Sequence, residues 1–203
     1  VVDANENPDD YIDGYYRWMD RKGEYQYEGK FYATTDNSKI FFTPERNLDG
    51  DLYGVSPYVS SKLMNNNGYA VPVTINKAGY YGIWIDLQAH TYSIWALEIP
   101  TDAYTGALCV TGEGFTIGNW ALSAEMTKIT DYRYTGTVSL VEGYGDYVYC
   151  LTSPDWSCQF HGDGKYWWIA SGGANLTFHT DYSGEVIVTF DTAYPWGTIK
   201  KSN

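Results

Sequence analysis

An internal repeat is the feature of this 203-residue sequence that most constrains its fold. The first half contains MDRKGEYQYEGKF and the second half MTKITDYRYTGTV, in which a methionine is followed at equal offsets by two tyrosines and a glycine. Later, AGYYGIWIDLQAHTYSI and SGEVIVTFDTAYPWGTI share a glycine, an aspartate and an isoleucine with gaps of seven and eight residues. The matched positions are Met19, Tyr25, Tyr27, Gly29, Gly79, Asp86 and Ile94 in the first half, and Met126, Tyr132, Tyr134, Gly136, Gly184, Asp191 and Ile199 in the second. Because the blocks keep their order about 105 residues apart, we predict two copies of one module.

Each copy reads as a series of short strands. Large and polar residues alternate in EYQYEGKF, YRYTGTVSL, YYGIWIDL and EVIVTFDT, and the aromatic runs KIFFT and YVYCLTS end at prolines. No window carries an apolar stripe of helical period. The pattern predicts an all-β fold of two tandem antiparallel β-sandwich domains, Ig-like or similar to carbohydrate-binding modules. Pro100 and Asp102 break the strand pattern that ends at Trp95, so we place the domains at 1–98 and 99–203. Residues 1–17 match ALCVTGEGFTIGNW poorly, which predicts an incomplete N-terminal edge for the first domain.

Composition excludes several classes of partner. The net charge of −12 disfavours nucleic acid and anionic membrane surfaces, because both require basic residues. No apolar run approaches the roughly 20 residues that span a bilayer, and the start of the chain lacks the pattern of a signal peptide. We therefore expect any membrane attachment to come from a lipid anchor outside this sequence. The odd set of Cys109, Cys150 and Cys158 predicts small buried side chains with at most one disulfide, and neither a metal site nor a cofactor is expected.

Large flat side chains and glycines are crowded together at residues 155–178, in DWSCQFHGDGKYWWIASGGANLTF. A sugar ring has an apolar C–H face and a rim of hydroxyl groups, so it suits an exposed aromatic platform beside hydrogen-bonding side chains. We expect Trp156 and Trp167 to supply the platform, and Lys165 and Asn175 to supply hydrogen bonds. Each has a structural alternative: the tryptophans could pack in a core, the lysine could be a solvated loop charge, and the asparagine could form a turn.

Two neighbours in this stretch receive a different interpretation. Adjacent side chains on a strand face opposite sides of a sheet, so only one of Trp167 and Trp168 is expected to reach a ligand. His161 lies inside the aromatic stretch and could donate to a sugar hydroxyl, but a solvated loop histidine is the favoured interpretation.

The second module resembles the module repeated in the SusE/SusF-like surface lipoproteins of Gram-negative glycan-utilisation systems. The resemblance covers residues 108–199 and rests on LCVTGEGFTIGNW, YRYTGTVSL, PDW, GGANLTF and SGEVIVTFD; residues 19–94 match less specifically. It implies a non-catalytic β-sandwich protein at the outer-membrane surface that binds oligosaccharides or polysaccharides beside other glycan-uptake components. It also adds Trp120, in the loop after the first strand, to the candidate binding residues. The sequence departs from the pattern at Asn119, which replaces a glycine, and the first module has no equivalent of Trp156 or of the GGAN turn.

An enzyme and an adhesion protein are the other classes to weigh. The three histidines, His90, His161 and His179, form no recognisable catalytic motif, and nothing in the sequence positions the pair of carboxylates that a glycosidase needs. A structural or adhesion protein could use the same aromatic residues to bind another protein, since tyrosine and tryptophan dominate protein hot spots. Glycan binding without catalysis is the function that the sequence favours.

Overall fold

The computed structural model describes residues 1–44, 48, 50–65, 69–162, 167–169 and 173–202. The predicted all-β fold is confirmed, and the paired strands of the described chain are antiparallel. Within these residues, helical structure is limited to the single 3-10 turn η1 (Pro8–Asp10), and no helix is long and apolar enough to cross a membrane. The chain forms two compact units: Val1–Asn7 with Tyr15–Ile99, and Pro8–Gly14 with Pro100–Asn203.

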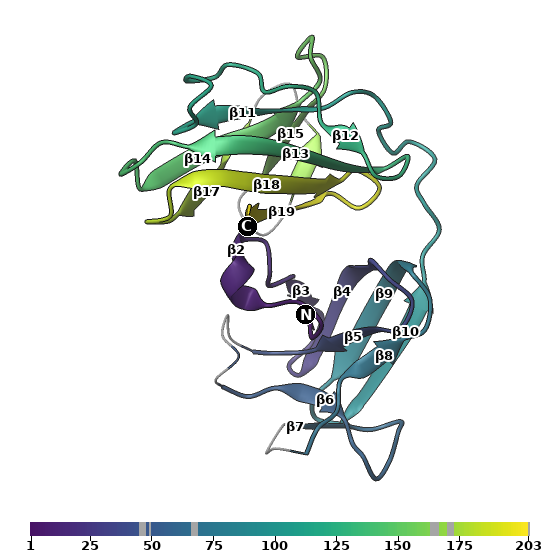
Figure 1. Ribbon diagram of the computed structural model, residues 1–203. Coiled ribbons are helices and arrows are strands. Elements are labelled where there is room, and N and C mark those ends of the chain that lie inside the picture. Colours follow the sequence, from purple (N-terminus) through teal and green to yellow (C-terminus); the bar gives the residue numbers. More distant parts are fainter. Residues whose placement is uncertain (45–47, 49, 66–68, 163–166, 170–172, 203) are drawn as a thin grey trace. The chain divides into compact units, whose positions relative to one another are not determined.

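The first unit contains a four-stranded sheet, a three-stranded sheet and a hairpin (Figure 1). The four-stranded sheet has the order β10 (Thr91–Ala96), β9 (Gly79–Asp86), β4 (Gln26–Ala33) and β3 (Met19–Arg21). The three-stranded sheet has the order β1 (Val2–Asp3), β5 (Ser38–Phe41) and β8 (Val73–Ile75). The hairpin is β6 (Tyr53–Val55) with β7 (Leu63–Asn65), and a bridge between Phe42 and Tyr53 connects it to the end of β5.

The second unit contains two five-stranded sheets. One has the order β12 (Thr127–Lys128), β13 (Arg133–Leu140), β18 (Gly184–Asp191), β19 (Trp196–Lys201) and β2 (Tyr11–Asp13). The other has the order β11 (Cys109–Glu113), β14 (Asp146–Thr152), β15 (Gln159–Gly162) and β16 (Trp167–Ile169), with β17 (Leu176–His179) also paired to β14.

Each unit has one apolar core, to which both of its larger sheets contribute. The strands alternate as the sequence predicts, because successive side chains point to opposite faces. In β14, for example, Tyr147, Tyr149 and Leu151 are at most 1% exposed, and in β18 Val186 and Val188 are equally buried. Burying these side chains is the main favourable term that holds the sheets together.

The residues of the sequence repeat occupy equivalent registers in the two units. Asp86 of β9 lies opposite Gln26 of β4 and Thr91 of β10. Asp191 of β18 lies opposite Arg133 and Trp196 in the same way. The equivalent partners are 107 and 105 residues apart, the spacing of the sequence blocks themselves.

Close packing explains the repeated methionine and glycine. A Cβ atom at Gly29 would lie 2.9 Å from Cγ of Met19, and one at Gly136 would lie 2.9 Å from Cγ of Met126, so each methionine packs where only glycine leaves room.

The repeated aspartates cap turns. Oδ1 of Asp86 accepts hydrogen bonds from the amides of Gln88 (2.9 Å) and Ala89 (2.8 Å), and Oδ1 of Asp191 accepts from Ala193 (2.9 Å) and Tyr194 (3.2 Å). A short carboxylate that receives two backbone amides is a strong turn signal, which accounts for its repetition.

The chain's start is divided between the units. β1 is only two residues long, whereas β11 has five. Residues Pro8–Gly14 belong to the second unit, where β2 extends the sheet through its pairing with β19. Nε1 of Trp196 donates to the Gly14 carbonyl at 3.3 Å. A domain boundary placed at Pro100 alone does not predict that Pro8–Gly14 joins the second unit.

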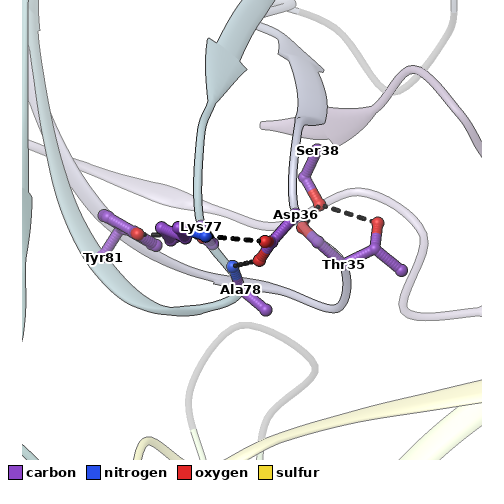
Figure 2. A network of polar contacts seen from close by, with 6 residues as sticks. All are labelled: Thr35, Asp36, Ser38, Lys77, Ala78 and Tyr81. Atoms are coloured by element: carbon purple, nitrogen blue, oxygen red, sulfur yellow. Dashed lines mark hydrogen bonds and ion pairs between the residues drawn. The ribbon is translucent and has the colours of Figure 1, made fainter.

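A polar network joins two turns of the first unit (Figure 2). The Asp36 carboxylate accepts hydrogen bonds from Nζ of Lys77 (3.0 Å) and from the amide of Ala78 (2.9 Å). The bond from the Ala78 amide, followed by that from Lys77, holds the pKa of Asp36 below its usual value. The Tyr81 hydroxyl donates to the Lys77 carbonyl at 2.9 Å, and Ser38 donates to the Thr35 carbonyl at 2.8 Å. Because the network joins the turn before β5 to the turn before β9, it is a structural clamp.

Candidate functional site

The candidate site begins at the turn that follows β14. The amide of Trp156 donates to the Ser153 carbonyl at 3.0 Å, which closes the turn. Oδ1 of Asp155 accepts hydrogen bonds from the hydroxyl groups of Ser153 (2.6 Å) and Ser157 (2.7 Å) and from the Ser157 amide (3.1 Å). These bonds, with Ser153 the strongest, lower the pKa of Asp155 to about 2, so the carboxylate is charged at neutral pH. The turn is therefore held by several short contacts although it lies at the surface.

Trp156 is presented by this turn in an unusual backbone conformation. Its φ angle is +61°, in the left-handed region that bulky residues seldom adopt. Its side chain remains 39% exposed. A strained backbone that displays a large aromatic ring is a feature that clusters at functional sites.

A chain of side-chain hydrogen bonds leads away from Trp156. Nε2 of Gln159 donates to the Trp156 carbonyl at 3.2 Å, and Oε1 of Gln159 faces Nε2 of His161 at 3.1 Å. Nδ1 of His161 lies 3.1 Å from Oδ1 of Asn175. His161 is only 4% exposed, so the expected solvated histidine is wrong: its strand pairing carries it inside.

The side-chain amide oxygens of Gln159 and Asn175 face the two nitrogens of the His161 ring. Gln159 uses an N–H on the Trp156 carbonyl, so its Oε1 is the atom turned toward Nε2 of His161. Oδ1 of Asn175 lies at Nδ1, and the tautomer of the ring decides which of the two nitrogens donates. The NH₂ group of Asn175 is the part of its side chain that does not face the imidazole.

A fork in the sheet brings these residues together. β14 pairs with β17 through residues 146–149 and with β15 through residues 151–152, so β15 and β17 leave the same edge of β14. Gly162, at the end of β15, donates its amide to the carbonyl of Ala174 at 3.2 Å. Asn175, next to Ala174, is thereby set beside His161. The structure thus joins two predicted residues, Trp156 and Asn175, through Gln159 and His161.

Two predicted site residues cannot be placed in this group. Lys165 lies outside the described residues. Trp167 lies in β16 opposite Gly162, and Trp168 lies opposite His161, but their side chains are also outside the described part.

Trp120 belongs to a different cluster at the other end of β14. Its φ angle is +58°, its amide donates to the Gly112 carbonyl at 2.7 Å, and its indole Nε1 donates to Oε1 of Glu113 at 2.9 Å. The hydroxyl of Tyr144, whose side chain is 42% exposed, lies 3.5 Å from Oε2 of Glu113. Gly112 is opposite Tyr149, four residues before Ser153, which puts this cluster about 13 Å along the strand from the Trp156 turn.

Sequence reasoning missed Glu113 and Tyr144, and no signal in the sequence marked them. Glutamate and tyrosine are frequent surface residues, and only the close return of the chain at Trp120 brings them together.

The cysteines of the second unit are free thiols. Cys109 and Cys150 are buried, and burial raises both pKa values, that of Cys150 to about 11, so these thiols are poor nucleophiles. Among the described residues, no group of three or more histidine, cysteine, aspartate or glutamate side chains is arranged to hold a metal ion.

Comparison of the sequence with protein-family models and with curated proteins finds no match to either.

Proposed function

We propose that this chain is a non-catalytic glycan-binding protein of the SusE/SusF-like type, built from two tandem β-sandwich modules. In this proposal the two larger sheets of each unit are the layers of a sandwich. The shared core of each unit supports that arrangement, because inward-facing residues of both sheets belong to one apolar cluster.

The observation that carries the proposal is the display of Trp156. A surface turn with no binding role would be expected to place glycine or asparagine at a φ of +61°. Here the turn holds a tryptophan, 39% exposed, with its backbone fixed by Ser153 and Asp155. A platform fixed before binding saves the entropy that a mobile side chain would lose.

The proposed mechanism is stacking of a sugar ring on Trp156 with hydrogen bonds along the rim. The amide oxygen of Asn175 faces His161, so its NH₂ group is the part placed to donate to a sugar hydroxyl. Gln159 has a second N–H left after its bond to the Trp156 carbonyl. Trp167 and Lys165 remain predicted contributors to the same surface.

Charge and affinity define the ligand class further. The net charge of −12 disfavours sulfated or uronic-acid-rich chains, so we propose a neutral oligosaccharide or polysaccharide. Stacking on one aromatic ring contributes about 1 kcal/mol beyond the area buried, so one site binds weakly, in the micromolar to millimolar range. Repeated units of a polymer raise the apparent affinity through avidity.

Location rests on the resemblance to the SusE/SusF-like lipoproteins. We propose that the protein faces outward at the outer-membrane surface, held by a lipid anchor outside this sequence and beside other glycan-uptake components.

Affinity electrophoresis in gels cast with a panel of neutral polysaccharides tests the proposal. We expect one polymer to retard the protein, and Trp156→Ala to weaken the apparent affinity at least tenfold. Trp95→Ala is the matched control, because Trp95 is 40% exposed and belongs to the first unit. Free migration in every gel would reject glycan binding and favour the adhesion alternative. Equal loss in both variants would reject the assignment to Trp156.

A further inference from the structure

A pocket of about 180 Å³ in the first unit is not used by the proposed glycan site. Its walls are mostly aromatic and apolar side chains from the loop before β3 and from the ends of β4, β5, β6 and β9. They include Tyr16, Trp18, Tyr27, Phe42, Tyr53 and Ile85. Trp18 is 43% exposed beside it. An apolar concavity of this kind is a candidate binding surface.

The repeat identifies the equivalent place in the second unit. Tyr27 lies opposite Ile85 as Tyr134 lies opposite Phe190. Tyr53 forms a bridge with Phe42 as Phe160 pairs with Leu151. Tyr27 and Tyr53 in the pocket wall are partly exposed, whereas their counterparts in the second unit, Tyr134 and Phe160, are fully buried.

The second unit fills that place with its own chain, at the segment Tyr104–Leu108 before β11. The Tyr104 ring packs edge-on against the Phe160 ring at a centroid distance of 5.9 Å, and Leu108 is 0% exposed. The hydroxyl of Tyr134 donates to the Gly106 carbonyl at 2.8 Å.

Two further bonds tie the segment down. The hydroxyl of Thr192 donates to the Tyr104 carbonyl at 2.6 Å, and the amide of Met126 donates to the Leu108 carbonyl at 2.7 Å. By the spacing of the repeat, Thr192 corresponds to Leu87 and Met126 to Met19, and both of these line the pocket. The segment therefore contacts counterparts of the pocket walls.

The geometry of β1 shows how such a segment would enter the first unit. Arg17 donates its amide to the Val1 carbonyl at 2.9 Å, as Ser123 donates to the Val110 carbonyl at 2.9 Å, so Val1 corresponds to Val110. Lys22 donates its amide to Gln26 of β4, and donors alternate along an antiparallel strand, so the amide of Met19 points away from β4. The Met126 amide that binds Leu108 has the same orientation.

We propose that the pocket of the first unit is an acceptor for an extended peptide segment that joins β1 as Tyr104–Leu108 joins β11. The segment carries a tyrosine whose ring packs against Tyr53. Four residues later, a leucine follows whose carbonyl accepts the amide hydrogen of Met19. It completes the sheet edge and the core of the first unit together, as strand addition does in other proteins.

Extended versions of the full chain test this proposal. One carries Ala-Tyr-Thr-Gly-Ala-Leu-Ser before Val1, and the control carries Ala-Ala-Thr-Gly-Ala-Ala-Ser, so both convert the Val1 amine to an amide. With the tyrosine and leucine we expect amide exchange at Met19 to slow at least tenfold relative to the control, and the thermal midpoint to rise by about 4 °C or more. Equal exchange and equal midpoints in the two chains would overturn the proposal.

A free peptide provides a second measurement should an extension prevent folding. Acetyl-Ala-Tyr-Thr-Gly-Ala-Leu-amide, titrated to millimolar concentration into the unextended chain, is expected to shift the amide signals of Met19 and Tyr27. The peptide with alanine in place of tyrosine and leucine should leave them unchanged. If a neutral oligosaccharide shifts the amide signals of Met19 and Tyr27 and the tyrosine peptide does not, the pocket binds a sugar and the proposal is overturned.

Discussion

Removing the Asn175 side chain tests the hydrogen-bond chain behind Trp156. In Asn175→Ala, Nδ1 of His161 loses its partner at 3.1 Å. Because His161 is 4% exposed, water reaches that nitrogen poorly.

The expected cost follows from this burial. A buried polar atom left without a partner costs about 1–3 kcal/mol. For a unit of about 100 residues, each kcal/mol lowers the midpoint of thermal unfolding by about 4–8 °C. We therefore expect the transition of the second unit to fall by at least about 4 °C.

Differential scanning calorimetry of the full chain measures this shift. Asn119→Ala is the matched control, because Asn119 is an exposed asparagine of the same unit, and its loss should change stability by less than about 0.5 kcal/mol. His161→Leu combined with Asn175→Ala should cost less than the sum of the single changes, since the histidine that needs a partner is gone. Equal midpoints for Asn175→Ala and Asn119→Ala would refute the hydrogen-bond chain.

Three further changes have defined outcomes. Burial raises the pKa of Tyr134 to about 12, so the free energy of unfolding should fall by up to about 2–3 kcal/mol as the pH rises from 10 to 12. Tyr134→Phe should remove that part of the alkaline loss while costing about 1 kcal/mol at neutral pH, as urea unfolding across this range would show. The hydrogen bonds that lower the pKa of Asp155 to about 2 stabilise its turn above pH 4, and this stabilisation is lost as the pH falls toward 2. The NMR signal of the Trp156 indole should follow that loss in the wild type and stay constant over the same range in Asp155→Asn. Gly136→Ala should cost about 1–3 kcal/mol, because the new Cβ would lie 2.9 Å from Cγ of Met126, and adding Met126→Ala should relieve the clash; the thermal midpoints of the single and double variants test this.

Local patterns predicted much of the fold. Strand alternation around Tyr134 and Val186 marked the core faces, because burial of one face of a strand leaves a period of two in the sequence. The methionine, glycine and aspartate of the repeat stood out because close packing and turn capping tolerate few other residues.

The remaining features depend on contacts between distant parts of the chain. The pairing of Tyr11 with Lys200 joins residues at opposite ends of the sequence, and nothing near Tyr11 announces it. Asn175 meets His161 only because β14 divides its pairing between two strands.

The candidate site shows the same division. The exposed Trp156 and the nearby Asn175 could be selected from residue chemistry, but the positive φ angle of Trp156 could not. Trp120 was predicted with them, yet its bond to Glu113 belongs to a separate cluster.

NMR titration with an oligosaccharide of whichever polymer retards the protein tests glycan binding at Trp156 most directly. The chain contains eight tryptophans, and the indole signal that disappears in Trp156→Ala identifies this one. The account predicts that the Trp156 signal shifts with ligand concentration while the signals of Trp18 and Trp95 stay in place. A Trp156 signal that does not move while the oligosaccharide binds elsewhere, or no movement of any indole signal, would contradict it.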